Sequence, residues 1–327
     1  MRNAIAALPF NPKKQQIGEI VVDVFGFSRG SAAARHFVSR RAALQTWPGQ
    51  PTARVTIKFV GLFDTVSSYD NTPAKTGNLG RAMGHLGSQP SREFSNDVAE
   101  LGLAIGGNAK RVVHLVAGDE YRLNFPSTNI QSSIAAGIGY EYTIPGAHSD
   151  IGGGYKEIET ERREFYNDQE RAQLVRDGWY TRAQLVDEPQ YVYSKTDNMR
   201  VIHRIVGKRN VHHHYQFISL LVMVLLATKS GLGLQLAQVD ENNAVFTEAQ
   251  FRRYNVPADL VMLARRLKDS ALGRYHPPAR AAFVLGADPI SVGVRNKYLH
   301  RSASSELGLG ALRDETTQRV RRQRIVG

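Results

Sequence analysis

Short apolar runs separated by glycine-rich turns dominate the first half of the chain. Such runs occur at Val21–Phe25, Val55–Phe63 and Lys110–Ala117, with a weaker one at Tyr140–Ile144. Each has the length of a buried strand, and helix-favouring stretches lie between them. This alternation predicts an α/β fold with a mostly parallel sheet. The polar, glycine-rich stretch from Ser67 to Gly107 is predicted to be an insertion over one edge of that sheet.

The second half has a different pattern. From about Glu157 the sequence is charged and helix-favouring, notably in Glu161–Arg176 and Thr181–Leu185. The most apolar run, Phe217–Ala227, is too short to span a bilayer and favours a buried core helix, with a membrane-facing lid as the alternative. We therefore predict two domains: a catalytic core at residues 1–156 and a mainly helical region at residues 157–327 that packs on or caps it.

A nucleophile elbow is predicted at the end of the first strand. Gly26-Phe27-Ser28-Arg29-Gly30 has the G-x-S-x-G pattern and lies between the Val21–Phe25 run and the small-residue stretch from Ser31 to Arg35. Glycines allow a strand and a helix to pass closely around a strained serine. The helix would begin at the serine, and the N–H of Arg29 would face an oxyanion formed there. The motif predicts a serine hydrolase site.

A serine nucleophile needs a histidine base and a carboxylate that orients it. Two acids follow predicted strands, Asp64 in Gly61-Leu62-Phe63-Asp64 and Asp119 after Ala117, and the residues alone leave both open. The base candidate is His148, in a glycine-rich loop after the last strand. His114 lies in mid-strand, which favours a core histidine.

Composition narrows the function classes. The 327 residues carry a net charge of +12, and the C-terminal end is basic (Arg319, Arg321, Arg322, Arg324). This favours anionic partners, but no nucleic-acid-binding pattern is present, so a lipid surface is the better expectation. The chain has no cysteine, and the consecutive His212-His213-His214 lack companion ligands, so we expect no metal and no cofactor. The N-terminus does not resemble a signal peptide.

Several of these segments resemble one family. They are Gly26–Arg35, Leu62–Val66, His114–Arg122 and Pro145–Tyr155, together with Asp177-Gly178-Trp179-Tyr180 and Lys297–Ser302. They are similar to the catalytic domain of the first class of type VI secretion lipase effectors, within a wider α/β-hydrolase family. The resemblance implies an α/β-hydrolase-like sheet and the triad Ser28, Asp64 and His148, so it favours Asp64 over Asp119.

The same resemblance implies a phospholipase that cleaves esters of membrane glycerophospholipids. Such an effector is made in the bacterial cytoplasm, secreted into the periplasm of a competitor, carried by a secretion spike protein and neutralised by an immunity protein. Family members have an earlier strand and an Asp-Gly-Thr loop before the elbow. On this basis the sheet is expected to be N-terminally truncated, which would leave the nucleophile strand at an unpaired edge.

Two other functions remain open from the sequence. The first is an inactive hydrolase fragment that acts as a binding or assembly part, because a lost oxyanion donor would cost about 3 kcal/mol of transition-state stabilisation. The second is an esterase acting on soluble esters, which would share the triad and differ in its pocket.

Overall fold

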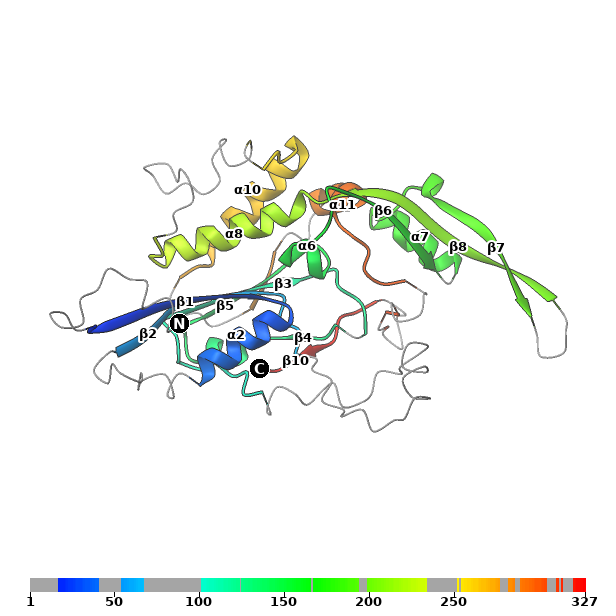
Figure 1. Cartoon of the computed structure of the whole chain (residues 1–327). Coiled ribbons are helices and arrows are strands. Elements are labelled where there is room, and N and C mark those ends of the chain that lie inside the picture. Colours follow the sequence, from blue (N-terminus) through cyan, green and yellow to red (C-terminus); the bar gives the residue numbers. More distant parts are fainter. Residues whose placement is uncertain are drawn as a thin grey trace, which may run out of the picture.

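The structure is a computed structural model. It describes residues 17–40, 54–67, 101–123, 125–165, 167–193, 199–233, 252, 254–276, 282–285, 289–304, 310–311, 313 and 320–327. Helices cover a central sheet, and a second, twisted sheet extends to one side of it (Figure 1). Most of the stretch predicted as an insertion, Ser67 to Gly107, lies outside the described residues.

The central sheet has five parallel strands in the order β1-β2-β3-β5-β9. Their bounds are Glu19–Phe27, Arg54–Phe63, Arg111–Ala117, Gly139–Ile144 and Ala282–Val284. The first four are the strands predicted from the apolar runs, so the predicted α/β class with a mostly parallel sheet is confirmed. Among the described strands β1 lies at an edge, where Val21 is 53% and Phe25 is 45% exposed.

Helices cover both faces of this sheet (Figure 1). Helix α2 (Arg29–Ser39) lies on one face, and α8 (Tyr215–Lys229) and α10 (Ala258–Gly273) lie on the other. Helix α8 contains the apolar run at 217–227, and most of its side chains are buried against strands and helices of the main core. It is therefore a core helix, as the apolar run favoured. No helix in the described part of the chain has the length and apolarity needed to cross a membrane.

The region after residue 157 is less helical than the sequence predicted. It contains α7 (Asp168–Arg176), α8, α10 and α11 (Pro289–Tyr298), but also an antiparallel sheet in the order β6-β8-β7. These strands are Ile158–Phe165, Met199–His212 and Leu185–Tyr193. The predicted helix at 161–176 is thus a strand in its first part, and 181–185 is a single 3-10 turn, Arg182–Gln184, followed by a strand. Cross-strand pairing outweighed the local helix preference.

Short elements complete the carboxyl edge of the central sheet. They are β4 (Ser127–Thr128), α6 (His148–Gly152) and β10 (Arg324–Ile325), whereas α5 (Gln131–Ala135) packs at the amino end of β5. Strand β10 pairs in parallel with β4, so the C-terminal segment lies next to the loop that follows β3. The fifth strand β9 also comes from the second half of the chain. The central sheet is therefore not confined to residues 1–156.

Candidate active site

Ser28 forms a sharp turn between β1 and α2. Its backbone angles are φ 58° and ψ −125°, which are strained for a residue with a Cβ atom. Its N–H donates to the Phe63 carbonyl at 3.0 Å. A Cβ on Gly26 would lie 2.5 Å from the Gly30 carbonyl oxygen, so the close strand–helix approach requires glycine there. Gly30 itself has no such neighbour, which corrects the expectation that both glycines are needed for this approach.

Asp64 and His148 meet at the carboxyl edge of the sheet. Asp64 directly follows β2, is fully buried, and accepts a hydrogen bond from the Ala117 N–H at 2.9 Å. His148 begins α6, and its Nδ1 lies 2.6 Å from Asp64 Oδ2. When Nδ1 of a neutral ring donates to a carboxylate, Nε2 is the acceptor. This is the tautomer that a general base requires.

The His148 ring lies against the elbow. Its centroid is 4.5 Å from the ring of Phe27, the residue before Ser28, and 5.1 Å from the ring of Phe125. Within the described residues no hydrogen bond joins the Ser28 hydroxyl to the His148 ring. In catalytic sites such bonds are often long without substrate and shorten when it binds.

Arg322 is a residue of this site that the sequence did not reveal. Its side chain is only 6% exposed, and its guanidinium donates to both oxygens of Asp64, at 2.5 Å to Oδ1 and 2.8 Å to Oδ2. It also donates to the carbonyls of Ala117 and Phe125. The sequence grouped Arg322 with a basic end available to anionic partners. The structure corrects this for Arg322, because the segment that leads into β10 brings this side chain inward; Arg324 donates to the Thr143 hydroxyl but stays largely exposed.

The electrostatics of Asp64 follow from these contacts. Burial alone raises the pKa of its carboxyl, but the positive charge of Arg322 and the hydrogen bond with His148 outweigh burial and bring the pKa below its usual range. Asp64 is therefore a carboxylate at any pH at which an esterase would be assayed. A permanent negative charge is what holds an imidazole in one orientation.

The alternative acid, Asp119, has other partners. Its carboxylate accepts hydrogen bonds from the Gly146 N–H at 2.8 Å and from the Tyr121 hydroxyl at 2.9 Å, and Arg295 lies at 3.2 Å. None of these contacts involves the His148 ring. Asp119 instead anchors the loop that leads into α6.

Two neighbouring groups are structural. Glu120 is buried, pairs with Arg122 at 2.8 Å and accepts from the His148 backbone N–H at 3.3 Å. His114 is fully buried: its Nδ1 donates to Glu141 at 3.0 Å, and its Nε2 accepts from the Thr65 N–H. His114 is thus a hydrogen-bonded core histidine between β2 and β5. It does not compete with His148 for the role of base.

The remaining predicted sites have simpler outcomes. Helix α2 begins at Arg29, so its N–H lies at the helix N-terminus next to Ser28; its role as an oxyanion donor stays a prediction. In the described residues no group of three or more histidines, cysteines or carboxylates is arranged to hold a metal ion. The ring of His213 packs edge to face against the rings of His214 and Phe217.

A strained serine, a buried carboxylate and a histidine lie at the carboxyl edge of a parallel α/β sheet, an arrangement that resembles the one in serine hydrolases. Comparison with known proteins then identifies the relatives. Residues 41–175 match the family described as the catalytic domain of Tle1-like phospholipase effectors of type VI secretion. This segment contains Asp64 and His148 and begins after Ser28. The resemblance inferred from the sequence is thereby confirmed.

Solved structures provide a second comparison. The chain is similar to the Tle1 effector solved bound to the VgrG spike of the type 6 secretion system, with 20% identity, a TM-score of 0.57, and coverage of 95% of this chain and 68% of that one. It also matches an uncharacterized protein from Pseudomonas aeruginosa at 20% identity and a TM-score of 0.41, over 85% of this chain and 31% of that one. A comparison with curated proteins gave no match. The first likeness shows a shared fold.

Proposed function

We propose that this chain is a serine hydrolase that cleaves ester bonds of membrane glycerophospholipids. The observation that supports it most is the 2.6 Å contact between His148 and Asp64, on a ring packed against the elbow residue Phe27. The match of residues 41–175 to a phospholipase effector domain supports the substrate class.

In this proposal Ser28 Oγ attacks the ester carbonyl carbon while His148 Nε2 accepts the hydroxyl proton. The tetrahedral oxyanion is held by backbone N–H groups, with Arg29 as one donor. Collapse expels the alcohol, which takes the proton from His148, and leaves an acyl group on Ser28. Water, activated by the same histidine, then hydrolyses the acyl-enzyme. Asp64 orients the imidazole throughout, and Arg322 holds Asp64.

The cellular role is part of the same proposal. We infer delivery by type VI secretion to the periplasm of a target cell, with a spike protein as carrier and an immunity protein as the producer's protection. The Tle1 effector that shares this fold was solved bound to its VgrG spike, which supports the carrier. A membrane surface is the expected location of the substrate.

Labelling with a fluorophosphonate probe tests the mechanism. We expect the intact chain to be labelled and Ser28→Ala not to be labelled. Asp64→Asn should be labelled far more slowly, by about 10⁴-fold, because the wrong imidazole tautomer then faces the serine. Ser39→Ala is a matched control, since this serine lies at the far end of α2, where its hydroxyl donates to the His36 carbonyl.

Vesicle assays test the substrate. Release of fatty acid from phospholipid vesicles in preference to soluble short-chain esters would support a phospholipase, and the reverse preference would indicate an esterase. A folded chain that neither labels nor hydrolyses would contradict the proposal and leave a binding or assembly part.

A further inference from the structure

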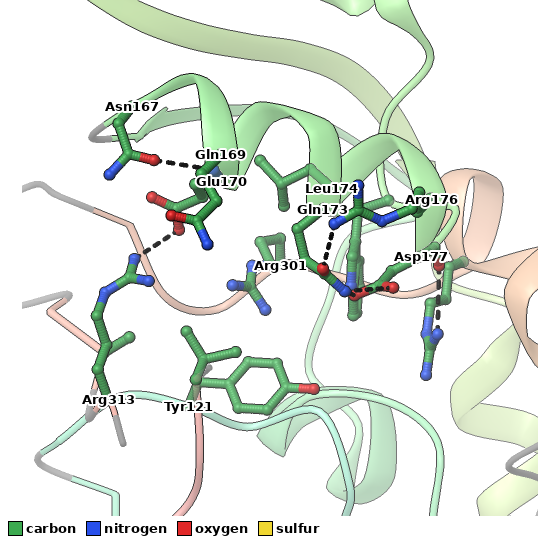
Figure 2. Close-up of a pocket in the computed structure, with 14 residues that line it drawn as sticks. Tyr121, Asn167, Gln169, Glu170, Gln173, Leu174, Arg176, Asp177, Arg301 and Arg313 are labelled. Atoms are coloured by element: carbon green, nitrogen blue, oxygen red, sulfur yellow. Dashed lines mark hydrogen bonds and ion pairs between the residues drawn. The ribbon is translucent and has the colours of Figure 1, made fainter. Parts of the chain in front are cut away.

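A cavity of about 1190 Å³ lies beside helix α7, between this helix, the loop after β3 and the C-terminal segments (Figure 2). None of Ser28, Asp64 and His148 lines it. Three segments that carry the family resemblance do contribute to it, through Tyr121, through Asp177 with Trp179, and through Arg301. The proposed hydrolysis gives these segments no direct role, so the cavity needs an explanation of its own.

Arg301 is the most informative residue of this cavity. The residue is only 3% exposed, yet in the described part of the chain its guanidinium donates no hydrogen bond and forms no ion pair. It stacks instead on the rings of Tyr121 at 4.6 Å and Trp179 at 5.4 Å. Figure 2 shows it pointing into the space between α7 and Tyr121. A buried cation without an anion is costly, because it loses water and gains no counter-charge.

Arg209 shows how this chain treats a buried arginine that is purely structural. Its guanidinium pairs with Glu161 at 2.7 Å and donates to the carbonyls of Trp179, Leu299 and α11. Every direction of its fork is thus used by protein atoms. Arg301 lies over the same Trp179 ring and has no comparable partner.

The lining of the cavity as a whole also carries more positive than negative charges. Four arginines line it against two carboxylates, namely Arg176, Arg295, Arg301 and Arg313 against Glu170 and Asp177. Glu170 pairs with Arg313 at 2.7 Å, and Asp177 accepts the Gln173 amide, so neither is offered to Arg301. Arg295 contacts Asp119 and the Asp177 carbonyl, but its Nε has no partner. Among the described residues, the cavity therefore has donors and positive charge without a protein partner.

We propose that this cavity binds a ligand carrying a phosphate group, with Arg301 as its main donor and Arg295 as a second. Arginine presents a planar fork that matches phosphate oxygens, and stacking on Tyr121 and Trp179 holds the fork in place before the ligand arrives. A phosphate can balance more than one positive charge, which a single carboxylate cannot. The volume exceeds that of a phosphate alone, so the substituent of a phosphate ester, free or in a lipid headgroup, also fits. This inference does not depend on the proposed hydrolysis.

The cavity is connected to the loop of His148. Tyr121 and Arg295 both contact the carboxylate of Asp119, which in turn holds the Gly146 N–H. A ligand that engages Arg295 would change one of the contacts that fix this loop. We therefore expect ligand binding to change the hydrogen bonding of Gly146, two residues before His148.

Isothermal titration with inorganic phosphate and with glycerol 3-phosphate tests the site in solution. We expect the intact chain to bind at least one of these probes and Arg301→Gln to bind at least about tenfold more weakly, because a buried charged donor is lost. Arg162→Gln is the matched control: it removes the same charge from the antiparallel sheet, where Arg162 pairs with Glu164 and Glu188 outside the cavity. Arg313→Gln is a second cavity variant for the case that Arg301→Gln does not fold.

Flotation with phosphatidylglycerol and phosphatidylcholine vesicles separates the two sources of phosphate. Binding of the soluble probes that depends on Arg301, with unchanged flotation of Arg301→Gln, would indicate a free phosphate compound. Flotation that falls in Arg301→Gln but not in Arg162→Gln would indicate a lipid headgroup. The proposal is overturned if the intact chain binds neither probe and floats equally with and without Arg301. It is also overturned if binding is the same in the cavity variants and in the control.

Discussion

At the level of single residues, Arg322 changes the charge that Asp64 is expected to present to His148. A carboxylate that orients a histidine usually balances the positive charge which that histidine acquires during the reaction. Here a guanidinium already neutralises Asp64 from the other side, at 2.5 and 2.8 Å. Arg322 thus fixes the position of Asp64, while it reduces the charge that Asp64 offers to a protonated His148. We describe Arg322 as a positioning residue for this reason.

Arg322→Gln tests this dual effect. With the cation removed, the full charge of Asp64 would favour the protonated ring of His148, so the pH profile of fluorophosphonate labelling should move to higher pH. The variant should also lose about 3 kcal/mol of stability, because a buried carboxylate loses a charged partner. Labelling across pH and urea unfolding measure the two effects. Arg321→Gln is the control, because Arg321 is the neighbouring residue and its side chain is exposed. If Arg322→Gln loses stability but its pH profile of labelling does not change, then Arg322 has a structural role alone.

The two candidate acids can be separated by equivalent substitutions. Asp119→Asn keeps the Gly146 contact within reach of an amide oxygen, and Asp119 does not touch the His148 ring. We expect its labelling rate to fall by no more than about tenfold, against about 10⁴-fold for Asp64→Asn. Similar losses in both variants would contradict the assignment of Asp64. Circular dichroism of both proteins controls for misfolding.

The three proposed catalytic residues each carry a local signal in the sequence, although that signal alone left Asp64 and Asp119 both open as the acid. Ser28 lies in a pentapeptide with its own backbone geometry, and Asp64 and His148 follow strands that the apolar pattern reveals. Arg322 lies 258 positions from Asp64, in a basic segment that reads as a solvated surface. Only the pairing of β10 with β4 brings the two together, and no local pattern of the sequence encodes that pairing.

At the level of elements, β6 shows why the helical prediction failed. Its sequence is rich in glutamate and arginine, which favour helices in isolation. In the sheet, the same residues pair across strands: Arg162 with Glu188 on the exposed face, and Glu161 with Arg209 on the buried face. Glu161 and Arg209 are 48 positions apart. A window of neighbouring residues contains no trace of this pairing.

The buried pair on this sheet provides an element-level prediction. Arg209 connects β8 to the Trp179 segment and to the end of α11, and Glu161 also accepts from the Tyr180 hydroxyl and the Arg301 N–H. Arg209→Met leaves Glu161 buried without a cation, so we expect a loss of about 3–5 kcal/mol in urea unfolding.

The control lies on the opposite face of the same sheet. Arg162→Gln breaks ion pairs that are partly exposed, so it should lower the free energy of unfolding by no more than about 1 kcal/mol. Equal losses in Arg209→Met and Arg162→Gln would show that the buried pair does not join these elements.

At the scale of the whole molecule, the core depends on both halves of the chain. Strand β9 extends the sheet beside β5, α8 covers β3, and the segment just before β10 supplies Arg322. The main hydrophobic cluster accordingly mixes residues of β3 and β5 with residues of α8, α10 and α11. We predict that a fragment of residues 17–156 does not fold, and that the intact chain unfolds in one transition. Circular dichroism of the fragment and calorimetry of the chain measure this. A folded, cooperative fragment would contradict it.

Buried carboxylates make the stability of the whole molecule sensitive to acid. Burial by itself raises each carboxyl pKa, but hydrogen bonds and nearby cations outweigh it at Asp64, Glu120, Glu141 and Glu161, whose pKa values are lowered. Asp150 is the exception, since burial prevails over its bond to His300 and its pKa is raised. The four lowered groups outnumber the one raised group, so they set the sign.

A group with a lowered pKa stabilises the fold above its unfolded pKa, near 4, and loses that contribution as pH falls toward the folded value. Asp150 acts in the opposite sense, with its contribution complete below its unfolded pKa and lost as pH rises through the raised one. We therefore expect the melting temperature to fall steadily from about pH 5 to pH 3. Glu161→Gln should flatten the slope, whereas Glu188→Gln, at a far more exposed ion pair, should change it little. A melting temperature that rises on acidification would mean that Asp150 outweighs the other four.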